Sequence, residues 1–242
     1  KEMVARLKAV GALTYVDAVQ YAPHGPIDVQ DLGCDFLVSS TYKYYGPHQG
    51  VLYGRLELLK ELPSWRLRVV DDESPGKFET GSQSLEGQAG TMAAVEYLQW
   101  VGRTMGAEFL PSNPTLRQRT REIHAGLIAM AEYEHQLSGR LIEGLQRIPG
   151  VVVRGITNPE RFAHRVPTIS ISADGVDPAD LAAFLDQHGV YVWNGHNYAL
   201  PVIEFLGLQD KGGVVRIGPT HYNTVEECDT VVRLIADYMV KA

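Results

Sequence analysis

The sequence predicts an α/β protein with two domains, and three observations lead to that prediction. Over the first half, short apolar runs of strand length alternate with helical patterns. Residues 110–114 (LPSNP) then interrupt the pattern with Pro and Asn, which marks a boundary or hinge. Beyond that point the chain becomes a mixture of helices and strands. We therefore expect one domain at residues 1–113 and an α+β domain at residues 114–242.

The first domain is expected to begin with a helix whose apolar positions Val4, Leu7 and Val10 lie at helical spacing. This helix leads straight into an apolar strand, which is typical of the middle of an α/β domain, so we expect N-terminal sequence of that domain to be missing. Each predicted strand is a short apolar run bounded by Gly or Pro. The strands are predicted at residues 13–19, 34–39 and 50–55, and further helices at residues 56–62 and 87–101.

The second domain opens with a long amphipathic helix that is closed by a Pro-Gly pair. Its apolar stripe consists of Ile123, Leu127, Met130, Leu137, Leu141, Leu145 and Ile148. Strands are predicted at residues 151–154, 168–172 and 214–217. Asp177 is a good helix N-cap, with Pro178 at the first helical position and Gly189 beyond the end. The last helix begins with a capping box at residues 224–227 (TVEE).

Composition argues against several classes of protein. The 242 residues carry a formal net charge of −7 with no cluster of Lys or Arg, so we expect neither nucleic acid nor a membrane surface as a partner. No apolar run approaches the ~20 residues that a membrane span requires. Cys34 and Cys228 form no disulfide framework and have no partner at zinc spacing, and the histidines are scattered, so no metal site is predicted. We expect a soluble, cytoplasmic protein.

The most informative segment is residues 39–50 (SSTYKYYGPHQG), in which Lys43 directly follows a predicted buried strand. The carboxyl ends of parallel strands are where ligands bind in α/β proteins. A lysine held there and partly desolvated is a usable amine nucleophile. The alternative is a lysine whose stem covers apolar surface while its ammonium group stays in water.

Asp17 makes the chemical interpretation of Lys43 stronger. It follows the apolar residues 13–16, so it also lies near a strand end, where a carboxylate needs a cation or hydrogen bonds. The alternative is a strand-end cap or a structural salt bridge. A strand-end aspartate and a strand-end lysine together suit a cofactor that needs a lysine Schiff base and a carboxylate facing a pyridinium nitrogen.

Five quoted segments carry a resemblance to a known family: VDAVQYAPHGPIDVQDLGCDFLVSSTYKYYGPHQGVLYGR, FETGSQSLEG, RVPTISI, WNGHNYALP and GGVVRIGPTHYNT. Together they resemble the class V aminotransferases, and within them the cysteine desulfurase-like branch of the fold-type I pyridoxal-phosphate enzymes. The resemblance implies that the chain is the C-terminal part of a fold-type I transferase. A parallel-rich sheet with flanking helices would be followed by a smaller α+β domain. The implied cofactor is pyridoxal 5′-phosphate (PLP).

The resemblance also implies roles around the cofactor. Lys43 would carry the internal aldimine, Asp17 would face the pyridine nitrogen, and Gln20 would hydrogen-bond the phenolic oxygen of PLP. Ser40 matches a hydroxyl that contacts the phosphate. Tyr42 stands where family members often have His, and its phenol can still donate to the phosphate.

Further roles fall later in the chain. Ser82 matches a hydroxyl that reaches the cofactor phosphate of a neighbouring subunit, which implies a homodimer with shared active sites. Arg216 matches the arginine that binds the α-carboxylate of an amino-acid substrate, a task that suits its planar fork. From position alone, Arg216 at a strand edge is a surface arginine. His196 and Asn197 lie in the loop that would contact the substrate.

The sequence departs from the desulfurases at the position where they carry a nucleophilic cysteine, because Tyr198 stands there. Transamination, β-elimination and epimerisation share a quinonoid intermediate, and the residues do not separate them. We expect a PLP-dependent transferase or lyase that performs transamination or β-elimination without sulfur capture. A non-catalytic fragment or remnant of such an enzyme is the alternative. A hydrolase that uses Ser39 or Ser40 with His48 is a third hypothesis, although no elbow or oxyanion motif accompanies it.

Overall fold

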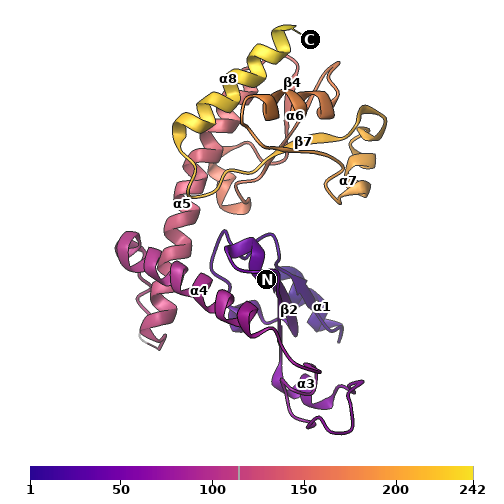
Figure 1. Ribbon diagram of the computed structural model, residues 1–242, viewed down its shortest axis with the longest axis vertical. Helices are drawn as coiled ribbons and strands as arrows, with labels where there is room; N and C mark the ends of the chain where they lie inside the picture. Colours follow the sequence, from indigo (N-terminus) through magenta and orange to yellow (C-terminus); the bar gives the residue numbers. More distant parts are fainter. Residues whose placement is uncertain (114, 242) are drawn as a thin grey trace. The chain divides into compact units, whose positions relative to one another are not determined.

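A computed structural model describes residues 1–113 and 115–241 (Figure 1). The chain folds into two compact units, Lys1–Ala129 and Met130–Ala242, and helix α5 (Gln118–Gln146) runs from the first into the second. Residue 114, where the sequence places the start of the second domain, lies outside the described residues. The two compact units divide within α5, and the N-terminal turns of this continuous helix pack against helix α4 (Leu85–Met105) of the first unit.

The first unit contains a three-stranded sheet in the order β1-β2-β3, with bounds β1 (Tyr15–Asp17), β2 (Phe36–Ser40) and β3 (Gly50–Gly54). Strand β1 pairs with β2 in parallel, whereas β3 pairs with β2 antiparallel. One face packs against α1 (Glu2–Ala9) and α2 (Val29–Leu32) through a small core of Val4, Ala18, Cys34 and Leu37. The three strands were predicted, but β1 is shorter than the expected residues 13–19.

A buried carboxylate explains why β1 begins late. The Asp35 side chain is 1% exposed, and its Oδ2 accepts hydrogen bonds from the Thr14 backbone N–H at 2.8 Å and from the Thr14 hydroxyl at 2.9 Å. Its Oδ1 accepts a hydrogen bond from Arg55 Nη1 at 2.9 Å. Thr14 is therefore held by a side chain, and the ends of all three strands are joined at this point.

The remaining elements of the first unit follow the sheet. Helix α3 (Leu56–Glu61) comes directly after β3, and the segment between α3 and α4 is fixed by Lys77, whose Nζ donates to the Lys60 carbonyl at 2.9 Å. Ser84 caps α4 by accepting a hydrogen bond from the Gly87 N–H at 3.1 Å. Short 3-10 turns are η1 (Thr41–Tyr44) and η2 (Ala107–Phe109).

The second unit is an antiparallel four-stranded sheet in the order β4-β5-β7-β6. Its elements are β4 (Val151–Arg154), η3 (Pro159–His164), β5 (Ile169–Ala173), α6 (Pro178–Gln187), β6 (Trp193–Gly195), α7 (Leu200–Phe205), η4 (Gln209–Lys211), β7 (Val214–Ile217) and α8 (Val225–Lys241). Helices α5, α6 and α8 cover one face, and their apolar side chains form one core with Ile169, Ile171, Val215 and Ile217 of the sheet (Figure 1).

The predicted helix starts of the second unit are confirmed. Asp177 Oδ1 accepts a hydrogen bond from the Ala179 N–H at 2.8 Å. Glu227 Oε2 accepts from the Thr224 N–H at 2.8 Å, and the Thr224 hydroxyl accepts from the Glu227 N–H at 3.2 Å, which completes the capping box. The α/β fold class is as predicted.

Over residues 1–113 and 115–241, no helix is both long and apolar enough to cross a membrane. Within the same ranges, no three His, Cys, Asp or Glu side chains lie together as metal ligands would.

Candidate functional site

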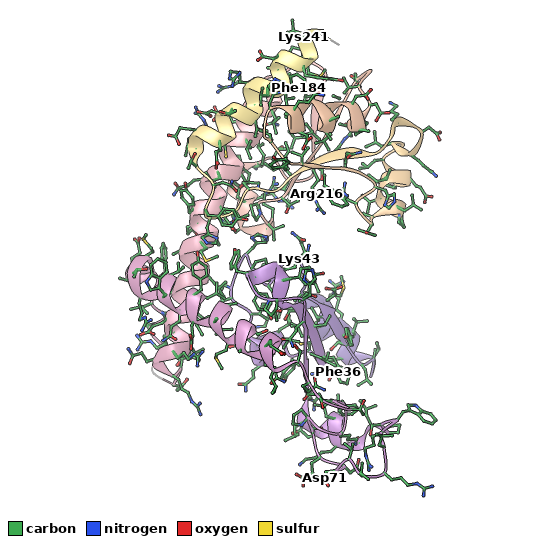
Figure 2. The ribbon with its side chains drawn as sticks, viewed as in Figure 1. Phe36, Lys43, Asp71, Phe184, Arg216 and Lys241 are labelled. Atoms are coloured by element: carbon green, nitrogen blue, oxygen red, sulfur yellow. The ribbon has the colours of Figure 1, made fainter. Side chains whose placement is uncertain are left out.

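The carboxyl ends of β1 and β2 lie at one edge of the first sheet. The two strands are parallel, and Asp17 at the end of β1 is level with Val38 of β2. Ser40 ends β2, and Lys43 follows in the turn η1 (Figure 2). The structure therefore brings Asp17, Ser40 and Lys43 to the edge where ligands of parallel sheets bind.

Asp17 is exposed, and its Oδ1 accepts a hydrogen bond from the Val19 N–H at 2.9 Å. This contact caps the end of β1, as one of the two structural alternatives predicted. Gln20 lies exposed in the turn that follows. The site is therefore open on this side in the first unit taken by itself.

Lys43 lies in a closed loop of residues 41–49. Thr41 is fully buried, its N–H donates to the Gln49 carbonyl at 2.9 Å, and its carbonyl accepts from the Gly46 N–H at 2.9 Å. The Thr41 hydroxyl also donates to the Pro47 carbonyl. A side chain at Gly46 would place its Cβ 3.0 Å from the Thr41 Cβ, so the turn fits glycine closely.

One aromatic ring of that loop lies near the amine, and a second ring stacks on the first. Lys43 is half-buried, and its Nζ lies 5.6 Å from the centroid of the Tyr42 ring. The Tyr42 ring in turn stacks on the His48 ring, with centroids 4.9 Å apart and planes 21° apart. The Ser39 hydroxyl is paired with the Tyr44 hydroxyl at 3.3 Å. Among the described residues, His48 makes no hydrogen bond to Ser39 or Ser40, so the Ser–His arrangement of the hydrolase hypothesis is not formed.

Gln49 connects the lysine loop to the start of α4. Its Oε1 accepts a hydrogen bond from the Thr91 hydroxyl at 3.0 Å, and its Nε2 donates to the Ser84 carbonyl at 3.5 Å. Ser82 lies two residues before the Ser84 cap, is exposed, and follows Gly81, whose φ is +76°. Ser82 is thus near the lysine loop in the fold, although no contact joins its side chain to Lys43.

Arg216 belongs to the second unit. It alternates along β7 with Val215 and Ile217, which lie in the helix-covered core, so Arg216 lies on the opposite face of the sheet. Figure 2 shows Arg216 on that side of the sheet and Phe184 of α6 on the other. The register places Ser170 of β5 and Trp193 of β6 beside Arg216 on the same face.

The loop after β6 has an unusual backbone. Asn197 and Tyr198 adopt positive φ angles of 49° and 61°, which residues other than glycine rarely adopt. Asn197 Nδ2 donates to the Gly195 carbonyl at 3.1 Å, and the Tyr198 N–H donates to His196 Nδ1 at 3.1 Å. Tyr198 is 92% exposed. Strain of this kind is concentrated at functional sites in many proteins.

Both cysteines are buried away from these loops. Burial raises the pKa of the Cys34 thiol and raises that of Cys228 to about 11. A thiolate, not a thiol, is the nucleophile in cysteine chemistry. Neither cysteine therefore has the character of a reactive sulfur.

Sequence reasoning did not identify the roles of Thr41, His48 and Gln49. Thr41 and Gln49 were not singled out, and His48 was considered only as a hydrolase partner. The Gly-Pro pair between them signalled a turn, but no local rule indicated which side chains the turn would bring together.

Comparison with known proteins identifies the family. The sequence model of the class V aminotransferases matches residues 1–109 and 119–231. A probable cysteine desulfurase 2 of Mycobacterium leprae is 34% identical over 96% of this chain, and a cysteine desulfurase of Pectobacterium carotovorum is 33% identical over 96%. These matches cover 51% and 52% of the two relatives, so the chain spans about half the length of the curated relatives it matches.

Solved structures agree with the sequence matches. The apo structure of a cysteine desulfurase from Thermococcus onnurineus covers all of this chain with a TM-score of 0.82 and 29% identity, over 56% of its own length. Class V aminotransferases and cysteine desulfurases are PLP-dependent enzymes. Because both the family match and this structural likeness extend over nearly all of the chain, the protein belongs to the class V aminotransferase family and is similar to its cysteine desulfurases.

Proposed function

We propose that this chain carries the lysine half of a PLP site and acts on an amino acid by transamination or β-elimination. The observation that carries the proposal is the position of Asp17 at the end of β1 and of Lys43 just after β2, because these are adjacent parallel strands whose ends lie at one sheet edge. The match to a PLP-dependent family over both segments supports it.

The side chains at this edge fit PLP by their chemistry. The Lys43 amine suits the aldehyde of the cofactor, and the Asp17 carboxylate suits a protonated ring nitrogen. The hydroxyls of Ser40 and Tyr42 suit phosphate oxygens, and the amide of Gln20 suits the phenolic oxygen. When bound, PLP withdraws electrons from the Cα of the amino acid attached to it.

The chain's own residues would then transfer and hold protons and would fix the position of the cofactor. Lys43 Nζ would hold the cofactor covalently and, once released by a substrate amine, would take the proton from the substrate Cα and return it. Asp17, as a carboxylate, would hold the proton on the ring nitrogen. Its hydrogen bond from the Val19 N–H fixes the carboxylate at the end of β1.

Residues of the second unit are proposed to bind the substrate. Arg216 lies on the face of the sheet opposite helices α5, α6 and α8, where its guanidinium can bind an α-carboxylate in a bidentate manner. His196 and Asn197 would contact the rest of the amino acid from the strained loop after β6. His196 Nδ1 accepts a hydrogen bond from the Tyr198 N–H, so a neutral His196 ring carries its proton on Nε2 and offers it as a donor.

The cysteine content argues against capture of sulfur on the protein. Tyr198 stands at the exposed tip of the loop where desulfurases would carry their nucleophile, and a phenol cannot hold a persulfide. Cys34 and Cys228 are buried thiols with raised pKa values. Any leaving group would then depart into solution.

We also propose a homodimer in which Ser82 reaches the phosphate of a neighbouring subunit. The exposure of Ser82 beside the α4 cap is consistent with this proposal.

Borohydride reduction tests the assignment of Lys43. The chain is mixed with PLP, reduced with sodium borohydride, digested and examined by mass spectrometry. We expect the reduced adduct on the peptide that contains Lys43, and its loss in Lys43→Ala. Lys8→Ala is the control, because Lys8 is an exposed lysine that bonds the Gly33 carbonyl. An adduct of undiminished yield in Lys43→Ala would overturn the proposal.

A further inference from the structure

The loop that carries Lys43 brings together two residues, Tyr42 and His48, that are six positions apart in the sequence. Thr41 closes the loop through its hydrogen bonds to Gly46, Pro47 and Gln49. Tyr42 follows Thr41 and His48 precedes Gln49, so closure of the loop brings the two rings side by side. Their stack, with centroids 4.9 Å apart, is a consequence of this closure.

The stacked rings of Tyr42 and His48 are exposed and do not contribute to core packing. Tyr42 is 45% exposed, His48 is also exposed, and neither ring belongs to the described core cluster around Val4, Cys34 and Leu37. An exposed tyrosine ordinarily samples several rotamers, and ordering it costs conformational entropy. Contact with a neighbouring ring offsets part of that cost. His48 therefore limits the positions that the Tyr42 ring can take.

The same Tyr42 ring contacts the amine of Lys43. The distance of 5.6 Å from Lys43 Nζ to the ring centroid lies within the ≈ 6 Å of a cation–π interaction. A lysine side chain has four rotatable bonds, so its amine is placed only where a second group holds it. The Tyr42 ring is such a group, and His48 is the side chain that holds the ring.

We propose that His48 is a positioning residue for the Lys43 amine and acts through the ring of Tyr42. The inference rests on the proposed function for the importance of Lys43, but the contact between the three side chains exists without cofactor. His48 positions the Lys43 amine through the face of its ring that stacks on Tyr42. Its ring nitrogens do not, so a phenyl ring at position 48 serves equally well.

Competitive acetylation of the full chain without cofactor tests this proposal. The chain reacts with a trace of acetic anhydride at pH 8, and mass spectrometry gives the acetylation rate of Lys43 relative to Lys8. Contact with the Tyr42 ring holds the Lys43 amine and restricts its access to the reagent. We therefore expect His48→Ala to raise the relative rate of Lys43 by about two- to fivefold. His48→Phe is expected to keep the wild-type rate.

A second comparison shows whether His48 acts through Tyr42. Tyr42→Leu is expected to raise the Lys43 rate as His48→Ala does, and the double variant should show no further increase, because both changes remove one contact. His188→Ala is the matched control, since the His188 ring packs on Phe184 at 4.4 Å in the second unit. It should leave the Lys43 rate unchanged.

Two results would overturn the inference. One is a Lys43 rate in His48→Ala equal to that of the wild type, in a variant whose circular dichroism and melting temperature show that it is folded. The other is a rate in His48→Phe equal to that in His48→Ala, because the effect would then belong to the imidazole and not to the stack. Neither result depends on PLP binding, which the borohydride experiment tests separately.

Discussion

Gly102 of α4 lies against the backbone of Glu122 in α5: a Cβ at Gly102 would stand 1.7 Å from the Glu122 carbonyl oxygen. The contact is reciprocal, because a Cβ at Gly126 would stand 2.4 Å from the Leu98 carbonyl oxygen. The two helices therefore approach backbone to backbone, and this crossing fixes α4. The first turn of α4 carries the contacts to Gln49 of the lysine loop, so the crossing also supports the site.

Gly102→Ala is predicted to destabilise the first unit by about 1–3 kcal/mol or more, because the backbone of α5 must move to admit the methyl group. Urea unfolding followed by circular dichroism measures the change. Gly139→Ala is the matched control, since a Cβ there would meet only Cε2 of Phe162, at 3.2 Å. Alanine is the better helix former by about 1 kcal/mol, so this control should be neutral or stabilising. Equal destabilisation by both variants would contradict the close crossing.

The buried Asp35 predicts a stability that falls in acid. Burial alone would raise the pKa of Asp35, but hydrogen bonds from Thr14 and Arg55 outweigh it and hold the pKa below its ordinary value. A carboxyl group whose pKa is lowered in the folded state contributes stability above its unfolded pKa of about 3.9. That contribution is lost as the pH falls through the lower, folded pKa.

Asp35→Asn removes this contribution. We expect the variant to lose about 1.5–3 kcal/mol of unfolding free energy at pH 7, the usual range for hydrogen bonds to a charged group. The difference from wild type should shrink as the pH falls through the lowered folded pKa of the wild-type carboxyl group. Urea titrations of both proteins at pH 7, 4 and 2 measure it. A difference that stays constant over this range would show that the charge of Asp35 is not what stabilises the fold.

Asp17→Asn is predicted to impair catalysis while leaving the fold intact. The amide oxygen of Asn can still accept the Val19 N–H, so melting temperature should change little. It lacks the charge that holds a proton on the ring nitrogen, and loss of such electrostatic stabilisation costs about 10²–10³ in rate. The measurement is turnover of an amino acid by PLP-loaded protein. Asp28→Asn, at the N-cap of α2, is the control and should retain activity. Turnover within a few-fold of wild type in Asp17→Asn would exclude the role.

The elements that sequence reasoning located well are those with local signals. Helix α6 begins where Asp177 and Pro178 indicate, and α8 begins at the capping box of Thr224, because caps act within one turn. Strand β6 is not among the predicted strands, because WNG has no strand pattern and is a strand only through its pairing with β7. The extended backbone of Trp193 is thus set by tertiary contact.

In the candidate site, too, some features follow from local sequence signals and others depend on tertiary contacts. The positions of Lys43 and Asp17 after successive strands follow from chain order, and parallel pairing then puts both at one edge. The stack of Tyr42 on His48 depends on the path of the loop that buried Thr41 closes, which no pattern of neighbouring residues specifies. Sequence therefore predicted the strand-end residues but not the side chains that hold the amine.

The cysteines lead to the last prediction, which concerns the fate of sulfur. A desulfurase needs a thiolate on a mobile loop that can reach the substrate sulfur. Cys34 is 1% exposed in the core of the first unit, and Cys228 is 3% exposed on α8 within the core of the second. At neutral pH a thiol whose pKa is about 11, as for Cys228, is almost entirely protonated.

We therefore expect no persulfide on the protein when PLP-loaded enzyme is treated with cysteine. If elimination occurs, sulfide should appear in solution, and Cys34→Ser and Cys228→Ser should both turn over at the wild-type rate when folded. A thiol-specific probe with mass spectrometry detects a persulfide, and methylene blue formation measures free sulfide. Stoichiometric persulfide on either cysteine, lost together with turnover in the matching serine variant, would show that a buried thiol becomes accessible during the reaction. The sulfur would then be captured on the protein, and elimination into solution would be wrong.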